Sequence, residues 1–84
     1  MRYAEFKTEV EKLGLKVVER SDEHYVVSKD VIEWILVSVS KDIVCAMNTR
    51  YHGHMISEEI FRQLFHLLVK FSQTTIEERH YDDV

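Results

Sequence analysis

The chain has 84 residues, 45% of them hydrophobic and 31% charged, a balance typical of one small globular domain rather than a disordered segment. Its 15 acidic and 11 basic residues give a net charge of −4, which disfavours direct nucleic-acid binding because that requires a cationic surface. The one cysteine, Cys45, excludes an intramolecular disulfide and indicates a reducing compartment. With no long apolar run and no signal sequence, we expect a cytoplasmic protein that binds no membrane.

The first predicted element is an amphipathic helix over about residues 2–13. Its apolar residues recur at intervals of three and four and form one stripe: Tyr3, Phe6, Val10 and Leu13. Gly14 follows the last of them, where the left-handed backbone that ends many helices costs glycine least.

After this helix the pattern changes to β-branched runs separated by short polar breaks, which predicts an antiparallel sheet. The expected strands are 15–20, 24–28, 31–40 and 43–49. The tetrapeptide Val-Ser-Lys-Asp occurs twice, at 27–30 and 39–42. We interpret both copies as tight turns at Lys-Asp rather than as a duplicated functional motif.

A second amphipathic helix is expected over about residues 58–72, with Ser57 as its N-cap and two glutamates in its first turn. Its apolar face is wide: Ile60, Phe61, Leu64, Phe65, Leu67, Leu68 and Phe71. Residues 74–84 are expected to form a partly ordered acidic tail, with at most one more helical turn, of a single domain 1–84. The sequence therefore predicts an α+β domain, helix, antiparallel three- or four-stranded β-meander, helix, with both helices on one sheet face.

A two-residue turn at the second Lys-Asp pair would place Ser40 opposite Ile43, and one at the first pair would place Tyr25 opposite Trp34. Because side chains alternate along a strand, these pairings assign each strand residue to one of two sheet faces. The face with the larger side chains is the expected floor for the helices: Tyr25, Val27, Ile32, Trp34, Leu36, Ile43, Cys45 and Met47. We expect Trp34 to share one buried cluster with Phe61, Leu64 and Phe65.

The opposite face would carry an apolar band that helices on one side cannot cover: Ile35, Val37, Val39, Val44 and Ala46. Exposed apolar bands usually mark interfaces, so these residues are the predicted partner-binding surface. A register slip of one residue, or a tail folded across the band, would account for the same pattern without an interface.

Acidic residues cluster at Glu19, Asp22 and Glu23, and again in the tail. Such clusters are usually solvated surface, but they also complement basic grooves on partner proteins. We therefore add Glu19, Asp22 and Glu23 to the predicted partner-binding set.

The sequence predicts no catalytic, metal or cofactor site. His52-Gly53-His54 is interpreted as a polar loop, because a zinc site needs three or four ligands and no further zinc motif is present. No serine, cysteine or threonine stands in a nucleophile motif, and only two glycines are present, too few for a phosphate loop. A hydrolase that depends on these histidines or on a metal stays as a third alternative for the function.

The stretch Phe71-Ser72-Gln73-Thr74-Thr75-Ile76-Glu77-Glu78-Arg79, with the helix–meander–helix layout, resembles small uncharacterised proteins of phages and prophages of Gram-positive bacteria. Their second helix ends in a Thr-Pro-Ile/Leu-Glu-Glu-Arg-type tail, and Thr75 stands here in place of the proline.

In size, acidity and order of elements the chain is also similar to some anti-CRISPR proteins, which block a nuclease by occupying its nucleic-acid-binding surface. The resemblance implies a non-enzymatic accessory protein that binds a host protein, such as a defence nuclease, in the bacterial cytosol. The alternative is a self-associating structural or regulatory homodimer domain.

Overall fold

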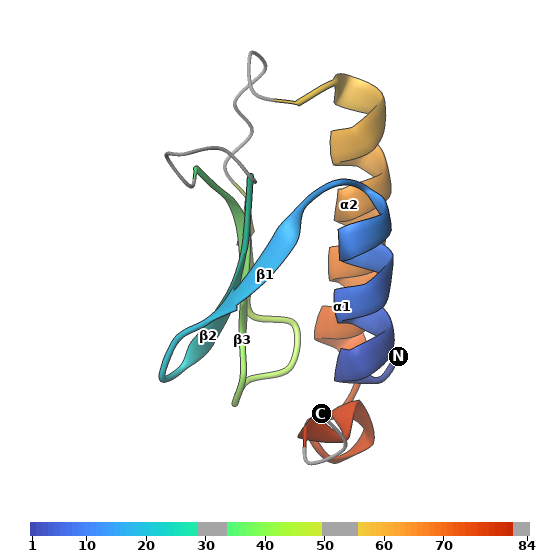
Figure 1. The fold of residues 1–84 in the computed structure, drawn as a ribbon. Helices are drawn as coiled ribbons and strands as arrows, with labels where there is room; N and C mark the ends of the chain where they lie inside the picture. Colours follow the sequence, from blue (N-terminus) through green and yellow to red (C-terminus); the bar gives the residue numbers. More distant parts are fainter. Residues whose placement is uncertain (29–33, 50–55, 82–84) are drawn as a thin grey trace.

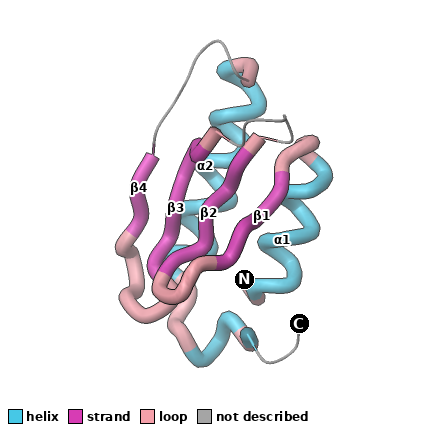
Figure 2. The backbone as a smooth tube through the Cα atoms, turned by 60° about the vertical axis from the view of Figure 1, so that its left-hand side comes forward, coloured by secondary structure: helices cyan, strands magenta, loops and turns pink. Residues whose placement is uncertain are grey.

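The computed structural model describes residues 1–28, 34–49 and 56–81. Its elements in chain order are α1 (Tyr3–Lys12), β1 (Lys16–Glu19), β2 (Glu23–Val27), β3 (Ile35–Ser40), β4 (Met47–Thr49), α2 (Glu58–Gln73) and the 3-10 helix η1 (Glu77–Arg79). The four strands form one antiparallel sheet in the order β1-β2-β3-β4 (Figure 2). Both long helices lie on the same side of this sheet (Figure 1). The predicted α+β layout of helix, meander and helix is confirmed.

Helix α1 ends where its sequence predicts. Gly14 has a φ of +81°, in the left-handed region, and its N–H donates to the carbonyl of Glu11 at 3.0 Å. The apolar stripe of α1 turns toward the sheet, and Tyr3, Phe6 and Val10 are almost completely buried. The connection from α1 to β1 is short, so the helix must pack directly on the sheet that follows it.

Helix α2 begins at its predicted cap. The Ser57 hydroxyl accepts a hydrogen bond from the backbone N–H of Ile60 at 3.2 Å, which satisfies one of the donors that a helix start leaves free. Leu64, Leu68 and Phe71 are fully buried, and the ring of Phe71 stacks on that of Phe6 with 4.5 Å between ring centroids. The core therefore lies between the two helices and the sheet.

The predicted cluster of Trp34 with Phe61, Leu64 and Phe65 is largely wrong. Leu64 is fully buried, but Trp34 is 39% exposed and Phe65 is 40% exposed. Phe61 packs against the core while only partly buried. Phe65 is exposed because the apolar face of α2 is wider than α1 and the sheet can cover.

Strands β1 and β2 match their predictions, but β4 is much shorter than expected. Residues 41–46 form a six-residue loop between β3 and β4 instead of a two-residue turn and the start of a strand. Ser38 consequently pairs with Asn48, three residues beyond the predicted partner Cys45. The first Lys-Asp pair lies outside the described residues.

The helices cover the opposite sheet face from the one predicted. Val37 and Val39 are 0% and 1% exposed within the core, although the sequence placed them on the uncovered side. They pair with Val26 and His24 of β2, and the His24 ring stacks on Tyr3 of α1. The helices supply bulky aromatic rings here, so the valine-rich face complements them in volume better than a face of large side chains would.

An irregularity in β3 adds one more large residue to the core. Val26 pairs with Val37 and Val27 pairs with Ile35, so the register passes over Leu36. Such a bulge lets two consecutive side chains reach the same side of a sheet. Leu36 and Val37 are accordingly both fully buried in the core cluster.

The uncovered face of the sheet is more polar than the predicted band. One row runs across all four strands on this face and contains Val18, Tyr25, Ser38 and Asn48. The Tyr25 hydroxyl donates a hydrogen bond to the carboxylate of Glu23 at 2.7 Å, and this bond raises the pKa of Tyr25. Asn48 is exposed in this row and Val18 and Tyr25 are partly exposed, whereas Ser38 is only 8% exposed.

Residues 74–81 fold back against one end of the domain and are anchored by Arg79, which is fully buried. Its guanidinium donates to the carbonyls of Ser40 at 2.7 Å, Ser72 at 3.1 Å and Thr74 at 3.1 Å, and to the Tyr81 hydroxyl at 2.9 Å. It also lies over the Phe71 ring, 4.7 Å from the ring centroid. Carbonyls at a helix C-terminus carry partial negative charge, so a cation is well placed there.

Candidate functional site

The loop between β3 and β4 has a defined shape that turns apolar side chains outward. The Ser40 hydroxyl accepts hydrogen bonds from the backbone N–H groups of Asp42 at 3.2 Å and Ile43 at 3.1 Å, which closes the start of the loop. Cys45 has a φ of +66°, and its N–H donates to the carbonyl of Ser72 at 2.8 Å. The loop is therefore fastened to the C-terminal end of α2.

Four large apolar side chains are exposed around this loop and the edge strand. Ile43 is 63% exposed and Val44 is 39% exposed in the loop, and Met47 is 37% exposed at the start of β4. The Ser72 hydroxyl of α2 contacts the Met47 sulfur at 3.5 Å. Phe65 lies seven residues before Ser72 and hence on the same side of α2, about 10 Å along the helix. We call Ile43, Val44, Met47 and Phe65 the β4-side strip.

An acidic turn lies at the same end of the sheet as the loop. Glu19, Asp22 and Glu23 flank the turn between β1 and β2, and Glu19 and Asp22 are exposed. The Lys41 N–H donates to the carbonyl of Asp22 at 2.9 Å, which joins this turn to the first residue of the β3–β4 loop. Asp22 and Glu23 thus adjoin the start of the β3–β4 loop, whereas Glu19 lies one strand further away, opposite His24.

The predicted apolar band does not form one surface. Val37 and Val39 are core residues, Ile35 and Ala46 are partly buried, and only Val44 is among the exposed large side chains. Ile43, Met47 and Phe65 were instead expected beneath the helices or in the core. The sequence did carry a signal for Phe65, because an apolar helix face of seven residues is wider than one packed stripe. No local signal separated the 41–46 loop from a strand.

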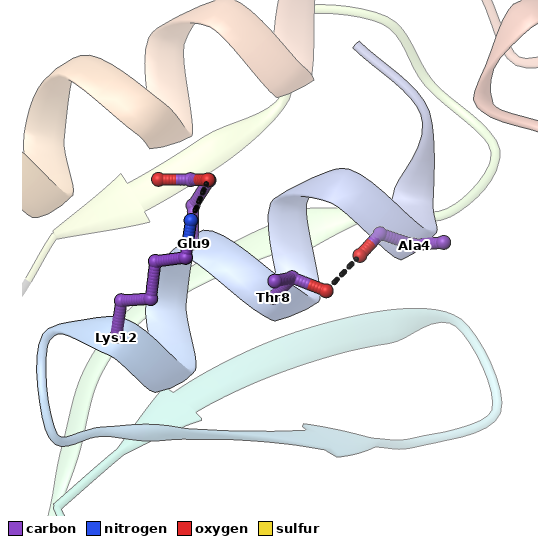
Figure 3. Close-up of polar contacts among 4 residues, drawn as sticks. All are labelled: Ala4, Thr8, Glu9 and Lys12. Atoms are coloured by element: carbon purple, nitrogen blue, oxygen red, sulfur yellow. Dashed lines mark hydrogen bonds and ion pairs between the residues drawn. The ribbon is translucent and has the colours of Figure 1, made fainter.

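A second surface feature is a groove between α1 and α2 on the side away from the sheet. Two adjoining hollows of about 520 and 450 Å³ share Glu9, Leu67 and Lys70 in their lining. Side chains along α1 find partners within the helix: the Thr8 hydroxyl donates to the backbone carbonyl of Ala4 at 2.9 Å, and the Lys12 ammonium pairs with the Glu9 carboxylate at 3.0 Å (Figure 3). Thr8, Glu9 and Lys12 therefore already have partners within α1.

Candidate groups for chemistry are dispersed. Cys45 is exposed in the loop, whereas the predicted register placed it toward the core. His52-Gly53-His54 lies outside the described residues, and His66 is exposed on α2. Within residues 1–28, 34–49 and 56–81, no three side chains of histidine, cysteine, aspartate or glutamate gather as a metal-binding group.

No protein-family model, curated protein or solved structure matches the chain. The resemblance to phage and prophage proteins therefore stays a prediction. In the part of the chain that the structure describes, no helix has the length and apolarity to cross a membrane.

Proposed function

We propose that the chain is a small non-enzymatic protein that acts by binding another protein through the β4-side strip. The observation that carries the proposal is the exposure of Ile43, Val44, Met47 and Phe65 beside an edge strand. Apolar surface contributes roughly 25 cal/mol for each Å² removed from water, so a partner that covers these four side chains gains a few kcal/mol. Aromatic and methionine side chains are also enriched at protein interfaces.

The adjoining charges support a partner with a basic surface. Asp22 and Glu23 adjoin the start of the β3–β4 loop, Glu19 lies on the same turn, and the whole chain carries a net charge of −4. An apolar pocket bordered by lysine and arginine would complement this surface and would speed association. The resemblance to phage and prophage accessory proteins supports a host protein of the bacterial cytosol as the partner. A defence nuclease fits, because its nucleic-acid groove is basic.

A homodimer is the second candidate. β4 lies at the edge of the sheet, and all three of its residues are exposed. Unpaired edge strands readily pair with a strand of another chain. Two copies that associate at this edge would bring their β4-side strips together.

The test is a comparison of three variants in capture from a Gram-positive host lysate, with the bound proteins identified by mass spectrometry. Phe65→Lys and Ile43→Lys each place a charge in the strip. Gln63→Lys adds the same charge at an exposed position on the α1 side of α2 and is the matched control. Circular dichroism establishes that all three variants fold.

The proposal predicts that one host protein is captured by the wild type and by Gln63→Lys and is lost with Phe65→Lys and Ile43→Lys. Weaker capture at high salt would identify the acidic turn as part of the contact. Self-association that only the two strip variants abolish, measured by analytical ultracentrifugation, would favour the homodimer. Capture and oligomeric state that no variant changes would refute the β4-side strip as an interface.

A further inference from the structure

His24 is buried in an unusual way. It lies on the helix-covered face of β2 with no exposed surface, and neither Nδ1 nor Nε2 has a hydrogen-bond partner among the described residues. Most buried polar side-chain atoms in proteins are hydrogen-bonded, since desolvation without a partner costs free energy. An imidazole that tolerates this position must be held in its neutral form by what surrounds it.

Aromatic rings enclose the imidazole. The Tyr3 ring stacks on one side, with 4.4 Å between centroids and 21° between planes. The Tyr81 ring also stacks on it at 5.2 Å and 30°, and Phe71 meets its edge at 6.2 Å. His24 therefore joins β2 to α1, α2 and the C-terminal segment.

The charges around the ring oppose protonation. The titratable and charged groups that face it are Tyr3 on α1, Glu19 on β1, Lys41 in the β3–β4 loop, and Arg79 and Tyr81 in the C-terminal segment. Burial, then Lys41 and Arg79, lower the pKa of His24 from 6.5 to about 4, and only Glu19 acts in the other direction. Burial also raises the pKa of Tyr3, so its hydroxyl stays neutral.

Tyr81 is the most weakly held part of this enclosure. Tyr3 lies in a helix of 10 residues and Phe71 in one of 16, whereas Tyr81 follows the three-residue helix η1. Its hydroxyl accepts the hydrogen bond from Arg79, so its ring and its hydroxyl link the imidazole to the buried guanidinium. Displacement of Tyr81 would admit water to His24 while the two long helices stay in place.

We propose that residues 74–81 form a pH-sensitive latch, which closes over the end of the domain only while His24 is neutral. In the released state the imidazole is hydrated and takes up a proton at its ordinary pKa. In the closed state that proton would be buried without a partner, close to Arg79 and Lys41. Acid therefore favours release, and neutral pH favours closure.

The size of the effect follows from the two pKa values. The pKa of His24 is 6.5 when the segment is released and about 4 when it is closed. The ratio of released to closed molecules therefore rises as the pH falls from 6.5 toward 4. At pH 5 that ratio is roughly 20-fold higher than at pH 7. This change is large enough to measure residue by residue.

The experiment is a pH titration of the isotope-labelled chain by NMR from pH 7.5 to pH 5. Corrected for the intrinsic effect of pH, amide hydrogen exchange of Arg79 and His80, which donate hydrogen bonds within the segment, is expected to speed up roughly 20-fold between pH 7 and pH 5, while that of Val26 and Leu64 keeps its protection. His24→Phe retains a flat stacking ring without a titratable nitrogen, and its segment is expected to stay closed throughout the titration.

Two further histidines provide controls. His66→Phe makes the same substitution at an exposed position on α2. His80→Asn removes the histidine inside the segment and retains a residue that tolerates its left-handed φ of 52°. Both variants are expected to release the segment at the same pH as the wild type.

The proposal is overturned if residues 77–81 do not respond to pH, if His24→Phe still releases them, or if His80→Asn abolishes the response. Loss of the core amides at the same pH as the segment would show global unfolding instead of a latch. Should His24→Phe fail to fold, Tyr81→Leu provides the test, because it removes the stacking ring. The pKa of its His24 should then rise from the low wild-type value toward 6.5, and an unchanged low pKa would equally refute the latch.

Discussion

Substitution of Arg79 by methionine tests how firmly the C-terminal segment is docked. Methionine keeps the apolar stem but removes the guanidinium from the carbonyls of Ser40, Ser72 and Thr74. A hydrogen bond to a charged group contributes about 1.5–3 kcal/mol net, and such bonds in one network do not add. We expect a loss of about 3–5 kcal/mol in the free energy of unfolding, because several buried acceptors lose their hydrogen bonds to one charged group.

That loss is large for a chain of 84 residues, whose total stability is expected to be about 4–13 kcal/mol. Urea unfolding followed by far-UV circular dichroism measures it directly. Arg62→Met is the matched control, since Arg62 is exposed on α2 and its replacement should change stability by no more than about 0.5 kcal/mol. The loss of stability for Arg79→Lys should lie between those of Arg79→Met and Arg62→Met, because one ammonium cannot donate hydrogen bonds to three separated carbonyls. A loss below about 1 kcal/mol for Arg79→Met would show that the segment is not docked as described.

Two further substitutions test the core and the orientation of the sheet. Leu64→Ala should cost about 2–5 kcal/mol in a urea melt, because Leu64 is fully buried; a cost within about 0.5 kcal/mol would mean that α2 does not pack on the sheet. Val37→Lys should unfold the domain, since it would bury an unpaired charge, whereas Asn48→Lys on the uncovered face should leave the circular dichroism spectrum unchanged. A folded Val37→Lys variant would restore the sheet orientation predicted from the sequence.

The candidate surface was only partly predictable. The acidic residues Glu19 and Asp22 and the apolar Val44 are exposed, as the sequence analysis expected. Met47 and Phe65 were missed because their exposure depends on where neighbouring elements end. β4 contains only three residues, and the far margin of α2 extends past the cover that the sheet provides. The width of the apolar face of α2 was a signal for the exposure of Phe65, whereas no local pattern indicated that of Met47.

Local patterns determined the helices of this protein. Gly14 ends α1 and Ser57 begins α2, because the left-handed backbone and the N-cap hydrogen bond act within a few residues of the chain. The alternation of side chains along β2 and β3 likewise placed His24 and Val37 on one face of the sheet and Tyr25 and Ser38 on the other, as the structure shows.

Only the tertiary structure decided which of these two sheet faces is covered. Both faces contain apolar residues, so the choice depends on how side chains from distant parts of the sequence fit against each other in volume. Tyr3 and Phe71 come from opposite ends of the chain, and their rings fill the space above Val37 and His24. The burial of Arg79 has the same origin, because its carbonyl acceptors belong to α2, the residues just after it, and β3. A local pattern specifies an element, but the contact between elements depends on shapes that no short stretch of sequence contains.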